Sequence, residues 1–346
     1  MIDLLEKYSN AFGVSGYEDE IREVIKESLK DNVDSIKTDF MGNLYGYKKC
    51  GEKNAKKVMV IAHMDEIGFM IDGVTKNGFL HFRRVGGIDP RILVSKRVLI
   101  GKDKIPGVLG AKPIHLQNRS EWKKPIPMQK LYIDIGAKNQ KKAKSYISKG
   151  DYATFNTKFE MQEDVLFGKA FDDRAGCGII TEILRGLEDD QHYPVDIIAV
   201  FTVQEEVGLR GASVLAEREK PDYVIAFEGT TAGDVPDPEK RDQSPSTQMR
   251  KGPSITVMDR TTIGFRKLKE HFERTAEKNN IPYQYKRSVT GGTDIGVIHT
   301  KGGIPSIVIS TPVRYIHAPR GIMALEDYKN TANLAINGLK NFKEVL

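Results

Sequence analysis

Apolar positions recur at helical intervals near the start of the chain. The spacing of three to four residues covers Ile21, Val24, Ile25 and Leu29, which predicts one buried helix face. Just before it, residues 15–18 read Ser-Gly-Tyr-Glu, the spacing of a capping box. A short β-branched run over residues 58–62 then predicts a buried strand.

The pattern of apolar and turn residues changes between residues 68 and 165. Short strand candidates alternate there with turn residues, and no helical period persists. The candidates are 79–82, followed by Gly86-Gly87; 97–100, followed by Gly101; and 131–135, followed by Gly136. This pattern predicts a compact β domain of short strands.

Strands and helices alternate after Phe171. We expect helices over 175–187, 265–278 and 325–342, and strands over 195–203, 223–227, 254–258 and 306–310. Such alternation favours an α/β fold with a mostly parallel sheet covered by helices on both faces. Residues 1–67 and 166–346 are therefore expected to form one α/β domain, with residues 68–165 inserted as a small β domain.

Composition and charge narrow the class of protein. The chain has 346 residues, of which 39% are hydrophobic and 29% charged, as in a soluble enzyme. No stretch approaches the ~18 apolar residues of a membrane span. The opening Met1–Glu6 carries acid where a signal peptide is basic, so we expect a cytoplasmic protein without a membrane partner. The net charge is +6, but acids are mixed with the lysines, so no nucleic-acid partner is expected.

Candidate chemistry lies where the predicted strands end, because sites in open α/β sheets form there. The two cysteines, Cys50 and Cys177, cannot build a disulfide framework or a cysteine-rich zinc site. Imidazoles and carboxylates occur instead at strand and helix ends: His63, Asp65, Asp172, Asp173, Glu205, Glu206, Glu228 and His317. Such ligands suit zinc, cobalt or manganese.

Each residue has a simpler explanation by itself. His63 could be a hydrogen-bonded core histidine, and Asp172-Asp173 could cap the next helix. Asp65, two residues beyond His63, could hold its imidazole. The functional interpretation depends on all these groups meeting at one end of the same sheet.

Four segments together resemble the tetrahedral-aminopeptidase family, and the resemblance covers essentially the whole chain. They are Ala62-His63-Met64-Asp65-Glu66-Ile67-Gly68, Gly168-Lys169-Ala170-Phe171-Asp172-Asp173-Arg174-Ala175-Gly176, Thr202-Val203-Gln204-Glu205-Glu206-Val207-Gly208 and Tyr315-Ile316-His317. The family comprises cytosolic di-metal exopeptidases, among them glutamyl, leucyl and lysyl aminopeptidases. The resemblance implies a zinc-exopeptidase-like α/β fold with an inserted β domain.

The resemblance also implies two divalent metal ions per subunit, zinc or cobalt, with manganese as a further option. One ion would be held by His63, Asp172 and Glu228, and the other by Asp172, Glu206 and His317, with Asp172 bridging. Glu205 would be the general base, and we group Asp65 with it as the holder of His63. Many family members have Asp where this chain has Glu228. The family places a glycine-rich turn, here Gly292, Thr293 and Asp294, beside the site.

The resemblance further implies short peptides as substrates and a homo-oligomer of twelve chains, with residues 68–165 carrying much of the contact. The loop over 117–129 could be exposed surface, or could line the interior or a neighbour's site. We expect neutral or aliphatic first residues, since no lone charge in the sequence marks a specificity pocket.

Three other functions stay open at this point. A carboxypeptidase or deacylase of the same clan would need a cation for a carboxylate, such as Arg260 or Arg314. A glycosidase of the endoglucanase type would need two facing carboxyls and would leave both histidines unexplained. A non-catalytic assembly module would hold no metal.

Overall fold

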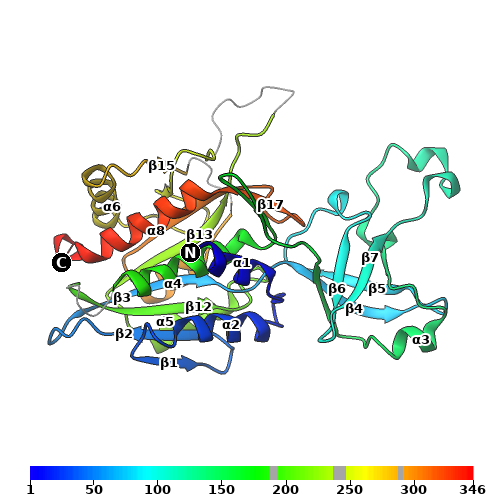
Figure 1. Cartoon of the computed structure of the whole chain (residues 1–346), viewed down its shortest axis with the longest axis horizontal. Coiled ribbons are helices and arrows are strands. Elements are labelled where there is room, and N and C mark those ends of the chain that lie inside the picture. The colour runs from blue at the N-terminus through cyan, green and yellow to red at the C-terminus, as the bar shows by residue number, and fades with distance from the viewer. Residues whose placement is uncertain (188–192, 237–246, 287–290, 346) are drawn as a thin grey trace.

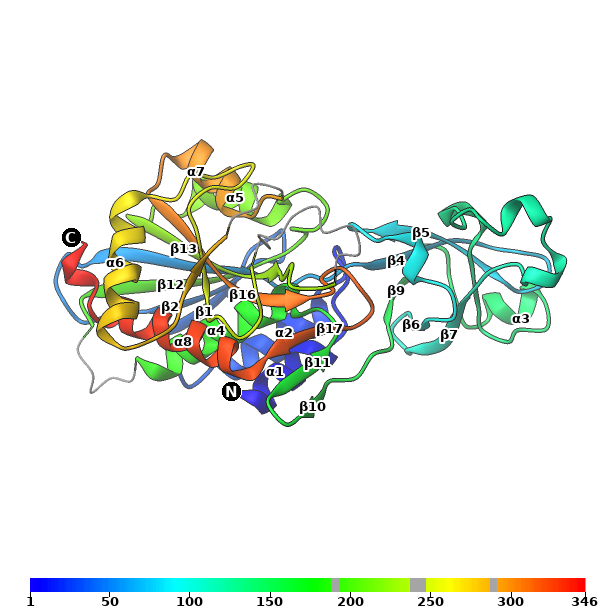
Figure 2. The same cartoon turned by 90° about the horizontal axis from the view of Figure 1, so that it is seen from above.

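The computed structural model describes residues 1–187, 193–236, 247–286 and 291–345. An α/β domain occupies one end of an elongated molecule and a small β barrel the other (Figure 1). The chain leaves the large domain after β3, builds the barrel and returns (Figure 2). The expected α/β fold with an inserted β domain is confirmed.

The large sheet is mixed rather than mostly parallel. Its strands are β1 (Ser35–Thr38), β2 (Leu44–Lys48), β3 (Lys56–His63), β10 (Glu160–Gln162), β11 (Val165–Gly168), β12 (Val195–Thr202), β13 (Tyr223–Thr231), β14 (Ser254–Thr256), β15 (Gln284–Tyr285), β16 (Ser306–Arg314) and β17 (Gly321–Ala324). The order is β1-β2-β12-β3-β13-β16-β17-β11-β10, with β14 beside β16. The central strands β12, β3, β13 and β16 run parallel, and the outer strands pair antiparallel except for β15, which runs parallel to β14. Short connections such as those of β1–β2 and β10–β11 allow only antiparallel pairing.

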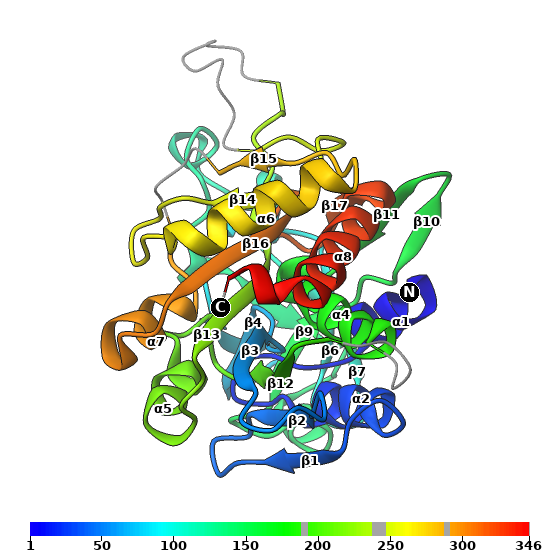
Figure 3. The ribbon, with the colours of Figure 1, turned by 90° about the vertical axis from the view of Figure 1, so that its left-hand side faces the viewer.

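Helices cover both faces of this sheet. They are α1 (Ile2–Asn10), α2 (Asp19–Leu29), α4 (Phe171–Gly186), α5 (Arg210–Arg218), α6 (Arg266–Lys278), α7 (Ile295–Gly302) and α8 (Leu325–Lys340). Viewed roughly along the strands, α5 and α7 lie on one side and α1, α2, α4 and α8 on the other (Figure 3). The predicted helices and strands of this domain are present, with shifted ends.

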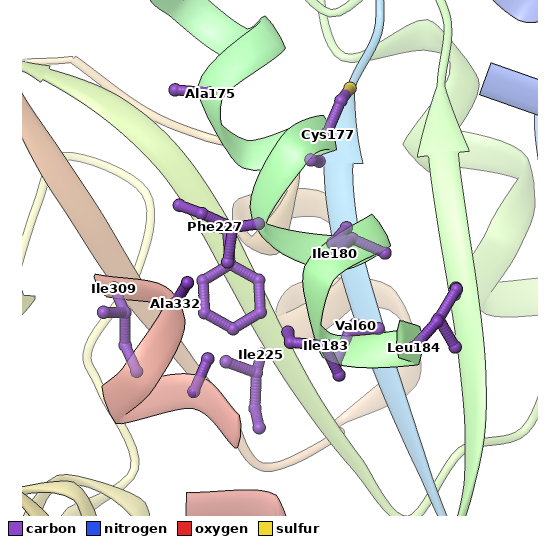
Figure 4. Packing of buried hydrophobic residues seen from close by; sticks show 14 of the residues in the cluster. Val60, Ala175, Cys177, Ile180, Ile183, Leu184, Ile225, Phe227, Ile309 and Ala332 are labelled. Carbon is purple, nitrogen blue, oxygen red and sulfur yellow. The ribbon is translucent and has the colours of Figure 1, made fainter. Parts of the chain in front are cut away.

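Helix α4 packs closest to the centre of the sheet. Its apolar side chains meet those of β3, β13, β16 and α8 (Figure 4). Gly176 allows this approach, because a Cβ there would lie 2.6 Å from the carbonyl oxygen of Phe227 on β13. The start of α4 is thereby fixed against the sheet beside the carboxyl ends of its strands.

The barrel closes in the order β4-β5-β8-β7-β6-β9 around its own apolar core. Its elements are β4 (Gly68–Val74), β5 (Leu80–Val85), β6 (Arg97–Ile100), β7 (Ile105–Gly110), β8 (Tyr132–Asp134), the short helix α3 (Gln140–Lys144) and β9 (Tyr152–Phe155). Strand β10 at 160–162 already pairs in the large sheet, so the return to that sheet comes before residue 165. Residues 117–129 contain short 3₁₀ turns, and Trp122 there is half exposed.

The expected capping box before α2 is wrong. The helix begins at Asp19 with Glu18 as N-cap, and no side chain caps it. The Ser15 hydroxyl donates instead to Asp65 Oδ2 over 2.6 Å. The Glu18 carboxylate accepts from the amides of Gly16 and Gln204. The Ser15 and Glu18 side chains therefore bind other groups, among them Asp65 and the Gln204 amide, instead of capping the helix.

Among the described residues, no helix has both the length and the apolar character needed to cross a bilayer.

Candidate metal centre

The candidate residues converge at the carboxyl edge of the parallel strands. His63 ends β3 and pairs in register with Thr202 near the end of β12, three residues before Glu205. Glu228 lies inside β13 rather than after it, because β13 continues its pairing with β16 as far as Thr231. His317 follows β16.

Asp172 lies between the two histidines. Its Oδ1 is 3.1 Å from His63 Nε2, and its Oδ2 is 3.0 Å from His317 Nε2. Glu228 Oε2 lies 3.8 Å from His63 Nε2, and Glu206 Oε1 lies 3.2 Å from His317 Nε2. Each oxygen of Asp172 thus faces a different group of donors.

These donors form two groups that share Asp172. His63, Asp172 and Glu228 make one group, and Asp172, Glu206 and His317 the other, with ligand atoms in each group within 4.8 Å of one another. One imidazole nitrogen with two carboxylates is a donor set that divalent metals such as zinc accept. The residues therefore fit the two ions that the resemblance implies, and the assignment of each ligand stays a prediction.

The electrostatics of the bare site also favour cations. Burial raises the pKa values of Glu205, Glu206 and Glu228, and neighbouring carboxylates add to the effect. Burial would lower the pKa of the His317 imidazole, but Asp172 and Glu206 outweigh it and raise that pKa to about 11. These carboxyl groups therefore ionise less readily without a nearby cation, and divalent ions would favour their charged form.

Glu205 lines the cavity without belonging to either ligand group. Its Oε2 lies 4.0 Å from His63 Nε2, so the carboxylate is beside a donor of the first group. A general base needs that kind of position, close to the reacting water but not committed to a metal.

Asp65 contacts the Glu205-Glu206 loop as well as His63, whereas its spacing from His63 predicted only the second contact. Its Oδ1 lies 3.4 Å from His63 Nδ1. The same carboxylate accepts the backbone amides of Glu205, at 3.0 Å, and Glu206, at 3.2 Å. Asp65 is therefore a positioning residue that ties the end of β3 to the Glu205-Glu206 loop.

The two aspartates at the start of α4 have different tasks. Asp173 Oδ1 accepts the amide of Gly176 and Oδ2 accepts that of His63, so Asp173 caps the regular part of the helix. Asp172 makes no such cap and faces the imidazoles. The capping alternative thus holds for one member of the pair.

Non-glycine residues with left-handed backbone gather around the site. They are Ala170, Gln204, Leu209, Tyr315 and His317, with φ between 55° and 61°. This conformation is uncommon for such residues and occurs preferentially at functional sites, where surrounding contacts enforce it. Of these residues His317 itself lines the cavity, and Ala170, Gln204 and Tyr315 lie within two residues of the lining residues Asp172, Glu205 and His317.

A cavity of about 380 Å³ opens over the donors. The glycine-rich turn contributes Gly291, Gly292 and Thr293 to its lining, as expected for two of the three predicted residues. Asp294 does not line it, because its carboxylate turns inward and accepts the Thr202 hydroxyl. Lys286 also lines the cavity. No motif or spacing in the sequence marks Lys286 as a site residue.

The two arginines considered for binding a carboxylate are placed elsewhere. Arg314 forms a two-pronged ion pair with Asp234, at 2.9 and 2.6 Å. The Arg260 residue is exposed and does not line the cavity.

A buried ion cluster beside the site had no predicted role, although its residues stand in the quoted motifs. Lys169 Nζ donates to both oxygens of Glu66, at 2.6 and 2.8 Å, and Arg174 lies 3.5 Å from Glu66. Thr154 of the barrel donates to Glu66 Oε2. Burial lowers the pKa of Lys169 to about 8. The available signal was that Glu66, Lys169 and Arg174 lie within three residues of candidate ligands in those motifs.

Comparison with known proteins agrees with this geometry. The lysyl aminopeptidase of Pyrococcus furiosus is 32% identical over 99% of this chain and 97% of its own length. A Pyrococcus horikoshii TET1 peptidase structure superposes with a TM-score of 0.86 at 33% identity, covering 98% of this chain and 99% of that one. A Thermotoga maritima structure described as an endoglucanase superposes with a TM-score of 0.82 at 37% identity, covering 99% and 98%.

A sequence profile described as M42 glutamyl aminopeptidase matches residues 42–334. That match takes in the parallel strands, the barrel and each candidate ligand. The chain therefore belongs to the M42 peptidase family, and it is a hydrolase of peptide bonds of the aminopeptidase type.

Proposed function

We propose that the protein is a di-metal aminopeptidase that releases single residues from the unblocked amino ends of short peptides. The observation that carries this is the placement of Asp172, with one oxygen facing His63 and the other facing His317. A carboxylate held in this way suits a bridge between two ions, zinc or cobalt, with manganese also acceptable to these donors. The ions would polarise the scissile carbonyl and lower the pKa of the attacking water.

Glu205 is the proposed general base. It takes a proton from the water as the water oxygen attacks the carbonyl carbon, and gives that proton to the departing amine as the C–N bond breaks. Asp65 keeps Glu205 in place through its backbone amide and orients the His63 ring. Gly291, Gly292 and Thr293 form the wall against which the substrate lies.

The acidic lining supports binding of the amino end. Of the four carboxylates that line the cavity, Glu205 belongs to neither ligand group, and its charge would attract a free ammonium group rather than a carboxylate. Lys286 is a cation in the lining, so the carboxypeptidase alternative needs a direct test.

That test compares one peptide in three forms: unmodified, acetylated at the amino end and amidated at the carboxyl end. We expect release of the first residue from the unmodified and amidated peptides, and no turnover of the acetylated one. Mass spectrometry of the products, with a chelator-treated sample as control, identifies the end attacked. Release from the carboxyl end, or cleavage of the acetylated peptide, would move the assignment to a carboxypeptidase or deacylase.

One structural neighbour is described as an endoglucanase, so glycosidase activity is tested by adding a β-linked glucose oligosaccharide to the same assay. We expect no cleavage, because Glu205 and Glu206 are adjacent in one loop, whereas a glycosidase places its two carboxyls across the sugar bond. Both histidines would also lack a function in that reaction.

We further propose that the chain forms a dodecamer in the cytoplasm, with the barrel domain, about residues 68–165, carrying much of the contact. The TET1 relative is described as able to assemble into a tetrahedron or a large octahedral shell. Half-exposed apolar residues on the barrel, Ile114, Leu116 and Trp122, supply surface for such contacts. Light scattering at micromolar concentration should give a particle of twelve chains, and a strict monomer would contradict the proposal.

A further inference from the structure

The turn after β5 brings the barrel to the metal centre of the same chain. The last residue of β5, Val85, pairs with Gly68, only five residues beyond His63. The chain that leaves β5 must therefore emerge beside the carboxyl end of β3. Gly86 and Gly87 occupy that position.

Both glycines lie against candidate metal ligands. A Cβ on Gly87 would be 3.2 Å from His317 Nδ1 and 3.7 Å from its Cε1. A Cβ on Gly86 would be 3.4 Å from both Cβ and Oε2 of Glu206, and 2.7 Å from Ile67 Cγ2. The backbone of the turn thus lies so close to His317 that a side chain at Gly87 would press on its ring, and a side chain at Gly86 would touch Glu206 and collide with Ile67.

The turn is fixed to the barrel on its other side. Arg84 Nη1 donates to the carbonyl oxygen of Ile88 over 3.3 Å. The Ile88 and Ile67 side chains are buried in the barrel core. Gly86 has a φ of +82°, which a glycine adopts without strain. The residues on either side of the turn are therefore anchored by packing in the barrel.

The barrel is in turn clamped to the α/β domain at the ion cluster around Glu66. Thr154 on β9 and Lys169 beyond β11 both bind the Glu66 carboxylate, which is 2% exposed. Asp172 follows Lys169 by three residues, and Glu66 follows His63 by three. The clamp thus joins the barrel to the two segments that carry His63 and Asp172.

We propose that the Gly86–Gly87 turn is a positioning element of the metal centre, acting on the ion held by Asp172, Glu206 and His317. This rests on the proposed di-metal function. The turn packs against the His317 ring and the Glu206 side chain from the barrel side. This contact keeps the donor atoms of both residues directed toward Asp172. The inserted domain is then part of the hydrolytic site as well as an assembly surface.

The test is Co²⁺ titration, by calorimetry, into the full-length protein after metal removal. In Gly87→Ala the new methyl must displace the His317 ring by a few tenths of an ångström. We expect one binding step to weaken by about tenfold or more, as for other residues that orient a ligand. It should be the step that His317→Ala removes, while the step that His63→Ala removes stays at its wild-type affinity.

Gly73→Ala is the matched control, since Gly73 lies in β4 of the same barrel and a Cβ there meets nothing within 4 Å. If Gly87→Ala fails to fold, Gly86→Ala replaces it. Its control is Gly136→Ala, because Gly136 also has a positive φ and a Cβ there would meet no atom within 4 Å. Wild-type affinity at both steps in the folded variant, or a loss equal to that of the control, would overturn the proposed role of the turn. The proposed di-metal function would still stand after that result. A wild-type protein that binds no Co²⁺ would refute the proposed function instead.

Discussion

The Glu205→Gln enzyme is expected to keep its fold and both metal ions while kcat falls by about 10²–10⁴-fold. The amide cannot accept the proton of the attacking water. Its neighbours lose little, because the Glu205 side chain belongs to neither ligand group and its backbone amide still donates to Asp65. Steady-state kinetics on an unblocked peptide and metal analysis of the same preparation measure both effects.

Glu206→Gln is the matched control, an identical chemical change one residue along the loop. It should weaken metal binding, because Glu206 Oε1 lies 3.2 Å from His317 Nε2 in the second group. Metal loss in Glu205→Gln together with full metal content in Glu206→Gln would reverse the two assignments.

Asp172→Asn is expected to lose both ions and, with them, activity. The amide keeps one oxygen but replaces the other with an NH₂ group, which cannot serve as a ligand to a second ion. Both groups share Asp172, so both should fail together. Elemental analysis of the purified variant after dialysis measures the metal content.

His63→Ala and His317→Ala are the comparisons for this variant. Each histidine belongs to one group only, so each substitution should weaken a single ion. Two tightly bound ions in the Asp172→Asn protein would rule out the bridging assignment, whatever the histidine variants show.

The sequence could predict which candidate residues meet, because the carboxyl ends of parallel strands share one edge of a sheet. His63 and the Glu205-Glu206 pair follow from that rule alone. Asp172 and His317 follow from it only together with the family resemblance. Glu228 was predicted beyond its strand, since apolar residues mark burial and not the length of the hydrogen-bonded ladder.

Contacts between the two parts of the chain could not be predicted. Gly86 and Gly87 looked like an ordinary turn, because spacing along the sequence does not tell which ligands a loop approaches. Ser15 was assigned to a local cap, although its hydroxyl binds Asp65, fifty residues away. The antiparallel margins of the sheet were missed because strands of three to five residues carry too few positions to show a period.

The order of the strands has a consequence for synthesis of the protein. Strand β3 is made early, but its neighbours β12 and β13 lie more than 130 residues later in the chain, and His317 comes later still. A nascent chain can close the barrel first, since all six of its strands lie between Gly68 and Phe155, before β12 is made. The hydrolytic centre is completed only after His317 has left the ribosome. A nascent chain that has not yet reached His317 therefore lacks a ligand of the second group.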